Sequence, residues 1–440
     1  MPLSERLNTP ISNAELERRW RAVRAAMEKE KIDVLLMQNN NDHMGGYVRY
    51  FTDMPATNGY PNTVVFPRDD EMTVVCQGPF AGSEATAQGD QSWRGVKRIL
   101  TTPSYASAHY TKEYDPELAA TALKPFAQAT IGYVGTYQMS YALLDYVKCA
   151  FPQARFVDAT EMVDRIKVIK SAEEMELVKR AALMQDGAMR AAFAAATPGL
   201  RDTEVAAVAQ HYSQCHGSEN GIYLCASMPL GKPSKFANRH LQNRVIQKGD
   251  QIALLVEDNG PGGMYTELGR SCVVGAKVPQ AMKDELEFCK ASRKLTLDLL
   301  KPGTPCKDIW DAFNDFMRKN GRPAEARLYC HGQGYDLVER PLVRHDEPMT
   351  IENVELLPPR AGEVQIRMVA SGVCHSCLHV IDGSYVGAPL PIVLGDVVAC
   401  DEAVPLQPRQ RCVDLPGVQR RQHGAEPLLK GLLELVAVGW

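Results

Sequence analysis

The first third of the chain alternates between short apolar runs and longer segments with one apolar face. Between residues 15 and 30 the apolar positions recur at helical spacing, and a continuous apolar run at 32–37 then predicts a buried strand. Further strands are predicted at 62–66, 72–76, 96–100, 131–134 and 154–157, and a helix at 141–150. This alternation predicts an α/β domain over residues 1–165. The apolar pattern thins at 161–170, which predicts a linker.

A pattern of paired helices follows the predicted linker. Ser171 and Glu174 form a capping box, because the serine hydroxyl accepts a backbone amide while the glutamate reaches back to the cap. The helix that starts there is interrupted before Gly199, and the next helix ends before Gly217. We expect a helix at 202–215, which completes this first pair, and another helix at 306–319, in a second pair.

The same order of helix, proline, glycine and helix recurs later in the chain. The interval from Gly199 to Gly217 equals that from Gly303 to Gly321. Equal internal spacing favours a duplicated α+β domain over residues 166–349, with two ordinary helix pairs as the alternative.

Polar motifs with chemical potential lie between and after the two helix pairs. Lys235-Phe-Ala-Asn-Arg-His240 precedes a strand that ends at Glu257, and a glycine-rich turn then leads to Glu267. Cys330-His331-Gly-Gln-Gly334 comes after the second pair. Two acids on the arms of one hairpin can face each other and hold cations, which polarise a carbonyl and lower the pKa of a bridging water.

Over about residues 12–350 these motifs resemble the active-site frame of the pita-bread family of aminopeptidase P, prolidase and creatinase. The resemblance implies an α/β amino-terminal domain followed by a pseudo-twofold α+β pita-bread domain. It also implies a divalent metal centre of manganese, cobalt or zinc. Glu257 and Glu267 match acidic ligands, His331 matches the histidine ligand, and His240 matches the histidine that contacts substrate.

The same resemblance assigns supporting residues. Tyr265 and Arg270 lie on the hairpin arm of Glu267, the first as a hydrogen-bond donor into the pocket and the second as a carboxylate partner or catalyst. Substrate contacts are expected from Arg49, Glu339 and Arg340. Arg49, with Tyr47 and Tyr50, belongs to a region that reaches over the partner's pocket in creatinase-like homodimers.

Departures from the family pattern leave the chemistry open. Glutamate in place of aspartate adds a methylene, which moves a ligand oxygen by more than the ~0.2 Å tolerance of a metal site. Val338 stands where a second histidine is usual. Creatinase has lost its metal ligands and relies on the histidine equivalent to His240, so the hydrolase could be metal-dependent or metal-independent. It would cleave a C–N bond in a short peptide or amidino compound.

Alternatives of other classes stay open beside the hydrolase. They are a lyase of the same fold that acts on a sulfonium propionate, and an inactive scaffold that binds a ligand. From about residue 350 the chain instead resembles the start of a zinc alcohol dehydrogenase, with Cys374 at a zinc-ligand position and Ser376 at a proton-relay position. The sequence has no Gly-x-Gly-x-x-Gly loop after a strand, so we expect no NAD. We interpret 350–440 as a fused, mostly β remnant, and an oxidoreductase is the least favoured reading.

Length, charge and composition limit the partners and the cellular location that we expect for this protein. A chain of 440 residues is long enough for two or three domains with cores of their own. The net charge of −4 comes with no basic block, so neither nucleic acid nor an anionic membrane is an expected partner. No signal peptide and no apolar run of about 18 residues are evident, and the 12 cysteines are expected to be reduced thiols. Together these features predict a cytoplasmic enzyme.

Overall fold

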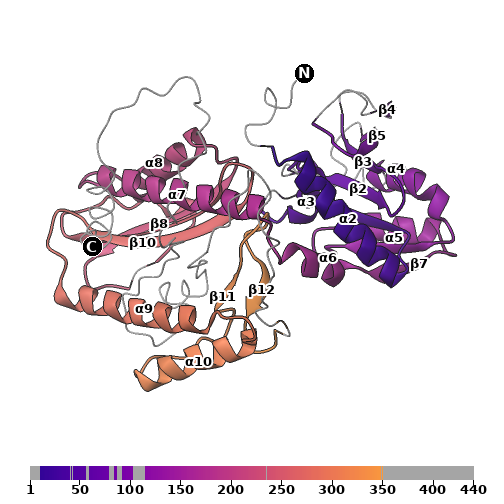
Figure 1. The fold of residues 1–440 in the computed structure, drawn as a ribbon. Helices are drawn as coiled ribbons and strands as arrows, with labels where there is room; N and C mark the ends of the chain where they lie inside the picture. Colours follow the sequence, from indigo (N-terminus) through magenta and orange to yellow (C-terminus); the bar gives the residue numbers. More distant parts are fainter. Residues whose placement is uncertain are drawn as a thin grey trace, which may run out of the picture.

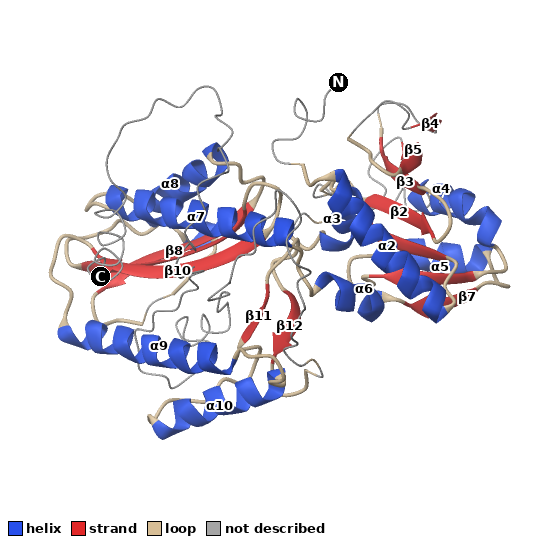
Figure 2. Cartoon of the chain, in the orientation of Figure 1, coloured by secondary structure: helices blue, strands red, loops and turns tan. Residues whose placement is uncertain are grey.

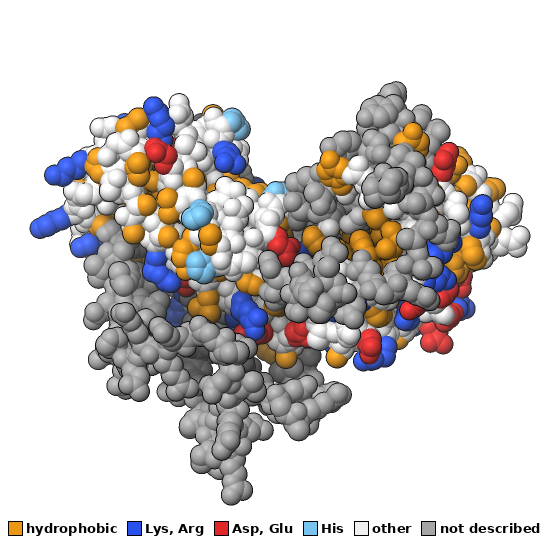
Figure 3. Space-filling view, turned by 90° about the horizontal axis from the view of Figure 1, so that it is seen from above, with side chains coloured by type: hydrophobic (Ala, Val, Ile, Leu, Met, Phe, Trp, Pro, Cys, Tyr) orange, Lys and Arg blue, Asp and Glu red, His pale blue; other side chains and the backbone are white. Residues whose placement is uncertain are grey.

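The computed structural model describes residues 10–39, 41, 43–55, 59–78, 84–86, 92–102, 114–233, 235–347 and 349. These residues form two domains that lie side by side (Figure 1). Figure 3 shows the two domains from above. The predicted dehydrogenase-like segment, with Cys374 and Ser376, lies outside the described residues.

A seven-stranded mixed sheet is the core of the first domain, in the order β4-β5-β3-β2-β1-β6-β7. Its strands are β1 (Val34–Asn39), β2 (Asn62–Pro67), β3 (Met72–Gln77), β4 (Glu84–Thr86), β5 (Val96–Thr102), β6 (Thr130–Val134) and β7 (Arg155–Asp158). The central strand β1 is antiparallel to β2 and parallel to β6, and all of its residues are buried. Burial on both faces explains why β1 reads as a continuous apolar run in the sequence.

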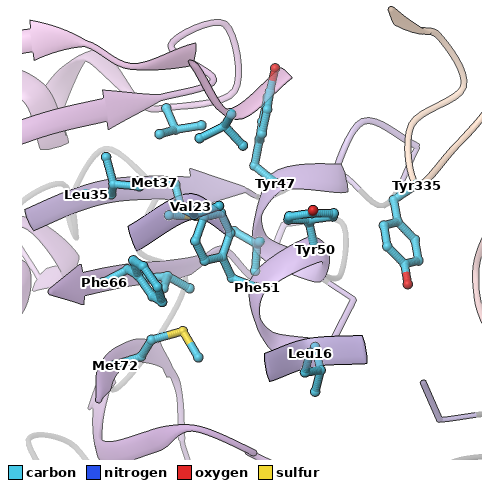
Figure 4. Packing of buried hydrophobic residues seen from close by; sticks show 14 of the residues in the cluster. Leu16, Val23, Leu35, Met37, Tyr47, Tyr50, Phe51, Phe66, Met72 and Tyr335 are labelled. Atoms are coloured by element: carbon cyan, nitrogen blue, oxygen red, sulfur yellow. The ribbon is translucent and has the colours of Figure 1, made fainter. Parts of the chain in front are cut away.

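Helices cover both faces of this sheet (Figure 2). They are α2 (Asn13–Glu30), α3 (Gly46–Thr52) and α6 (Thr160–Lys167) on one face, and α4 (Tyr114–Leu123), η2 (Lys124–Phe126) and α5 (Tyr141–Ala150) on the other. Leu35 and Met37 point into the core under α2 and α3 (Figure 4), whereas Val34 and Leu36 join the opposite core. The predicted α/β domain is confirmed in these elements.

The predicted linker at 161–170 is wrong, because α6 occupies most of it. Met162 and Val163 are buried against the sheet, and the helix also buries Lys167. Its apolar residues Met162, Val163 and Ile166 recur at helical spacing, so the sequence did carry the pattern of a short amphipathic helix.

In the second domain an antiparallel sheet has the order β10-β9-β8. Its strands are β8 (Gly221–Pro229), β9 (Asp250–Asn259) and β10 (Tyr265–Val273), with the short turn η3 (Arg239–Leu241) before β9. Helices α7 (Ala172–Ala195) and α8 (Asp202–Cys215) pack on one face. Below the other face in Figure 1 lie α9 (Gln280–Leu299) and α10 (Cys306–Lys319), while β11 (Cys330–Gly332) and β12 (Glu339–Val343) stand beside the first domain.

The local geometry of the helix pairs follows the sequence prediction. Glu174 donates its amide to the Ser171 hydroxyl at 3.2 Å and returns a carboxylate oxygen to the Ser171 amide at 2.8 Å. Helices α8 and α10 have the predicted bounds. The glycines that end the four segments all have positive φ, at 99°, 103°, 90° and 69° for Gly199, Gly217, Gly303 and Gly321. Only glycine takes this conformation without strain, so the two pairs repeat their turn geometry as well as their spacing.

Candidate active site

Glu257 and Glu267 stand directly opposite each other in β9 and β10. Residues paired in this way project from the same face of an antiparallel sheet. Their neighbours Val256 and Leu268 belong to the core beneath α7 and α8, so both carboxylates project from the other face. The two side chains are buried, with 2% and 4% of each residue exposed.

His331 approaches this pair from β11. Its Nε2 lies 3.8 Å from Glu267 Oε2, and the imidazole is fully buried. A proton on Nδ1 donates to the Gly332 carbonyl oxygen at 2.8 Å. That tautomer leaves Nε2, the nitrogen on the side of Glu267, free of a proton and therefore able to bind a metal or accept a proton.

Backbone contacts hold β11 against the hairpin. The Tyr265 amide donates to the Gly334 carbonyl oxygen at 2.6 Å, which ties the segment after His331 to the start of β10. At the hairpin turn, a Cβ on Gly260 would lie 2.5 Å from the Cα of Ala181 on α7. The absence of a side chain there lets the turn rest on the helix.

Asp258, next to Glu257, projects from the opposite face of the sheet. Its carboxylate accepts hydrogen bonds from Gln185 Nε2 at 2.7 Å and from the Tyr223 hydroxyl at 2.9 Å. Burial raises the pKa of Asp258 to about 6 in spite of these hydrogen bonds. The residue therefore fastens the sheet to α7, and Glu257 alone of the two acids faces the site.

The structure separates Tyr265 from Arg270. Tyr265 is buried and shares the face of Glu267, two positions away along β10. Arg270 projects from the α7 face, where its charge lies near Asp186 and its Nη1 donates to the Gly269 carbonyl oxygen at 2.8 Å. Strand alternation directs Arg270 away from Glu267 and towards Asp186, and its role in the reaction stays a prediction.

Two predicted substrate contacts also have structural partners. Arg49 is buried and donates from Nη2 to Glu219 Oε1 at 2.9 Å, and its guanidinium lies over the Tyr335 ring. Glu339 accepts a hydrogen bond from Lys170 Nζ at 2.8 Å. Both residues join the two domains, and their contacts with a substrate stay predictions.

A buried ion-pair group around Glu339 was not found from the sequence. Lys167 Nζ lies 3.2 Å from Glu339 Oε1 and 3.4 Å from Asp336 Oδ2. Burial by itself would raise the pKa of Glu339, but the charges of Lys167 and Lys170 outweigh burial and hold this pKa low, at about 2. The amphipathic pattern of α6 was the signal that would have placed Lys167 in a helix.

His240 lies on the exposed turn η3, ahead of β9. The structure pairs Glu257 with Glu267 and places His331 Nε2 3.8 Å from a Glu267 oxygen, whereas His240 is exposed.

The donor set suits a divalent cation by type. Two carboxylates and one imidazole are usual ligands of manganese, cobalt and zinc, and a cation would offset the repulsion between two buried acids. Across the described ranges, however, no group of three or more His, Cys, Asp or Glu side chains is gathered closely enough to hold a metal ion. Glu257, Glu267 and His331 are therefore of the right chemical type for a divalent metal. The described residues alone do not supply a complete set of ligands around one ion.

Residues 176–369 match the sequence model of metallopeptidase family M24, and residues 19–169 match the creatinase/prolidase N-terminal domain. The first match extends beyond residue 349, the predicted end of the second domain.

An uncharacterized hydrolase/peptidase of Sinorhizobium fredii is 27% identical over 71% of this chain and 79% of its own length. The Xaa-Pro dipeptidase of Pyrococcus furiosus is 24% identical, with 54% and 69% covered, and the creatinase of a Bacillus species is 22% identical, with 76% and 78% covered.

The fold is shared with solved structures. The X-Pro aminopeptidase of Thermotoga maritima superposes with a TM-score of 0.62 at 16% identity, and the alignment covers 86% of this chain and 94% of that one. The predicted order of an α/β domain and a pita-bread domain is confirmed. No helix among the described elements is long and apolar enough to cross a membrane.

Proposed function

We propose that this protein is a metal-dependent hydrolase of C–N bonds. The matches to the creatinase/prolidase N-terminal domain and to metallopeptidase family M24 support this proposal and placement in the pita-bread family. Its substrates would be short Xaa-Pro peptides or small amidino compounds, the classes that the named dipeptidase and creatinase suggest. The observation that carries the proposal is the buried Glu257–Glu267 pair, with His331 at 3.8 Å.

Each residue takes a role from its position. Glu257, Glu267 and His331 would hold a manganese, cobalt or zinc ion, which supplies polarisation of a scissile carbonyl and a bound water of lowered pKa. Tyr265 would donate a hydrogen bond from the same face of β10. His240, on its exposed turn, would contact the substrate from the solvent side or move a proton.

A metal-independent hydrolase of the creatinase type is the second candidate. The lengthened acids and the incomplete gathering of donors in the described segments favour it. In that route His240 would carry the proton transfer. A lyase of the same fold and an inactive scaffold are further outcomes of the same experiment.

The test measures metal content and turnover on the full-length protein, using Xaa-Pro dipeptides and creatine as substrates. We expect Glu267→Gln to lose metal and activity. We expect His240→Ala to keep its metal but to lose about 10²–10⁴-fold in turnover, the usual contribution of proton transfer. Glu176→Gln is the matched control, because that glutamate is 48% exposed on α7.

Unchanged metal content and activity in Glu267→Gln would contradict the metal-dependent proposal. A metal-free protein whose turnover disappears in His240→Ala would establish the second candidate. Turnover of a sulfonium propionate alone would indicate the lyase, and no turnover with any substrate would leave the scaffold.

A further inference from the structure

A cavity of about 200 Å³ lies between the two domains. The first domain contributes Tyr47 of α3, Tyr137 and the end of α6, and the second contributes residues between 336 and 342, which include most of β12. Glu257, Glu267 and His331 do not line it. The cavity is therefore a separate place on the molecule, and its volume is below the roughly 300–1,000 Å³ of sites for drug-sized ligands. Only a small metabolite would fit.

One wall of the cavity is already neutralised. Lys167 is buried between Asp336 and Glu339, with each of the three side chains at most 5% exposed. Glu339 also binds Lys170. These charges satisfy one another and hold the wall in place.

The same two elements, α6 and β12, also carry an acid and a base that do not satisfy each other. Arg340 Nε lies 3.9 Å from Asp164 Oδ2, and its Nη1 lies 4.0 Å from Glu161 Oε1, both beyond hydrogen-bond distance. Arg340 Nη1 is buried and has no hydrogen-bond partner among the described residues. Asp164 Oδ1 accepts from the Tyr47 hydroxyl at 2.7 Å, whereas Oδ2 is on the side of Arg340.

A buried guanidinium nitrogen without an acceptor costs free energy, and either water or a ligand can supply the acceptor. A planar carboxylate matches the fork of the arginine. Two cationic and three acidic side chains line the cavity, so a phosphate dianion would meet net repulsion. A ligand that brings an ammonium group for Asp164 together with a carboxylate for Arg340 keeps the charges balanced.

We propose that this inter-domain cavity binds a free α-amino acid as its zwitterion. The carboxylate binds Arg340, the ammonium binds Asp164 Oδ2, and the amino-acid side chain lies against the apolar lining, which includes Val338 and Leu342. The rings of Tyr47 and Tyr137, with centroids 6.3 Å apart, also line the cavity, and the Tyr47 ring already lies 4.3 Å from Lys167 Nζ. The inference rests on the cavity alone and not on the proposed hydrolase.

Calorimetric titration of the full-length protein tests the proposal with L-leucine, N-acetyl-L-leucine, L-leucinamide and inorganic phosphate as probes. L-Leucine should bind, and each of the other three should bind at least about tenfold more weakly, because each lacks one charged contact. Arg340→Gln and Asp164→Asn should each weaken L-leucine binding by a similar factor. Arg165→Gln, which alters a 64% exposed arginine on α6, should leave binding unchanged.

Glu267→Gln distinguishes this cavity from the candidate active site. Binding of L-leucine that survives Glu267→Gln but is lost in Arg340→Gln supports the proposal, whatever the outcome of the hydrolase assays. Binding that is lost in Glu267→Gln and kept in Arg340→Gln overturns it, as does stronger binding of phosphate or the acetylated probe, or no binding at all. Arg340→Lys, with thermal unfolding of every variant, separates lost binding from lost folding.

Discussion

Arg19 of α2 offers a sharp test of what holds the two domains together. Its guanidinium is fully buried and donates to Glu15 at 3.0 Å, to Glu174 of α7 at 2.9 Å and to the Tyr335 hydroxyl at 3.1 Å. It also lies against the rings of Tyr50 and Tyr335, whose positions Figure 4 shows. One side chain thus links the first domain to α7 and to the segment that follows His331.

Arg19→Met keeps much of the side-chain volume and removes the charge with its hydrogen bonds. Loss of one partner from a buried ion pair usually costs about 3–5 kcal/mol, because the other charge stays buried without compensation. Here Glu15 retains Arg18 at 2.7 Å and Glu174 retains the Ser171 amide at 2.8 Å. We therefore expect the lower end, a loss of about 3 kcal/mol in the free energy of unfolding.

Urea unfolding followed by circular dichroism measures this loss at constant slope of the transition. Arg21→Met is the matched control on the same helix, since Arg21 is 70% exposed and lies 3.8 Å from Glu17. Such a surface pair contributes at most about 1 kcal/mol. A loss in Arg19→Met no larger than that in Arg21→Met would refute the reasoning. A double variant with Glu174→Gln should recover part of the loss, because it removes the stranded acid.

Burial raises the pKa of Asp115 to about 7, so the folded protein keeps this group protonated while the unfolded chain ionises it near pH 4. The stability contributed by Asp115 is therefore full below pH 4 and is lost as the pH rises to about 7. For this reason Asp115→Asn should raise the melting temperature relative to the parent protein at pH 8 but not at pH 4. Equal differences at both pH values would contradict this. Gly260→Ala should lower the melting temperature more than Gly249→Ala, because its Cβ would meet Ala181 of α7 at 2.5 Å whereas Gly249 adjoins open space at a φ of +88°. A larger loss at Gly249 would mean that backbone strain outweighs the clash.

The sequence by itself determined the elements whose pattern is local. The apolar run of β1, the capping box of α7 and the bounds of α8 and α10 depend on neighbouring residues and turn glycines, so periodicity was sufficient. The pairing of Glu257 with Glu267 also follows from one hairpin, in which a short glycine-rich turn fixes the register.

Only the tertiary structure decided which distant groups meet. The approach of His331 to Glu267 depends on how β11 packs beside the hairpin, and no spacing in the sequence records it. The same is true of Lys167, whose charge is buried because Asp336 and Glu339 come from the other domain. Local periodicity fixes the face on which a residue lies, whereas the partners that make a buried charge stable are supplied by chain segments far away in sequence.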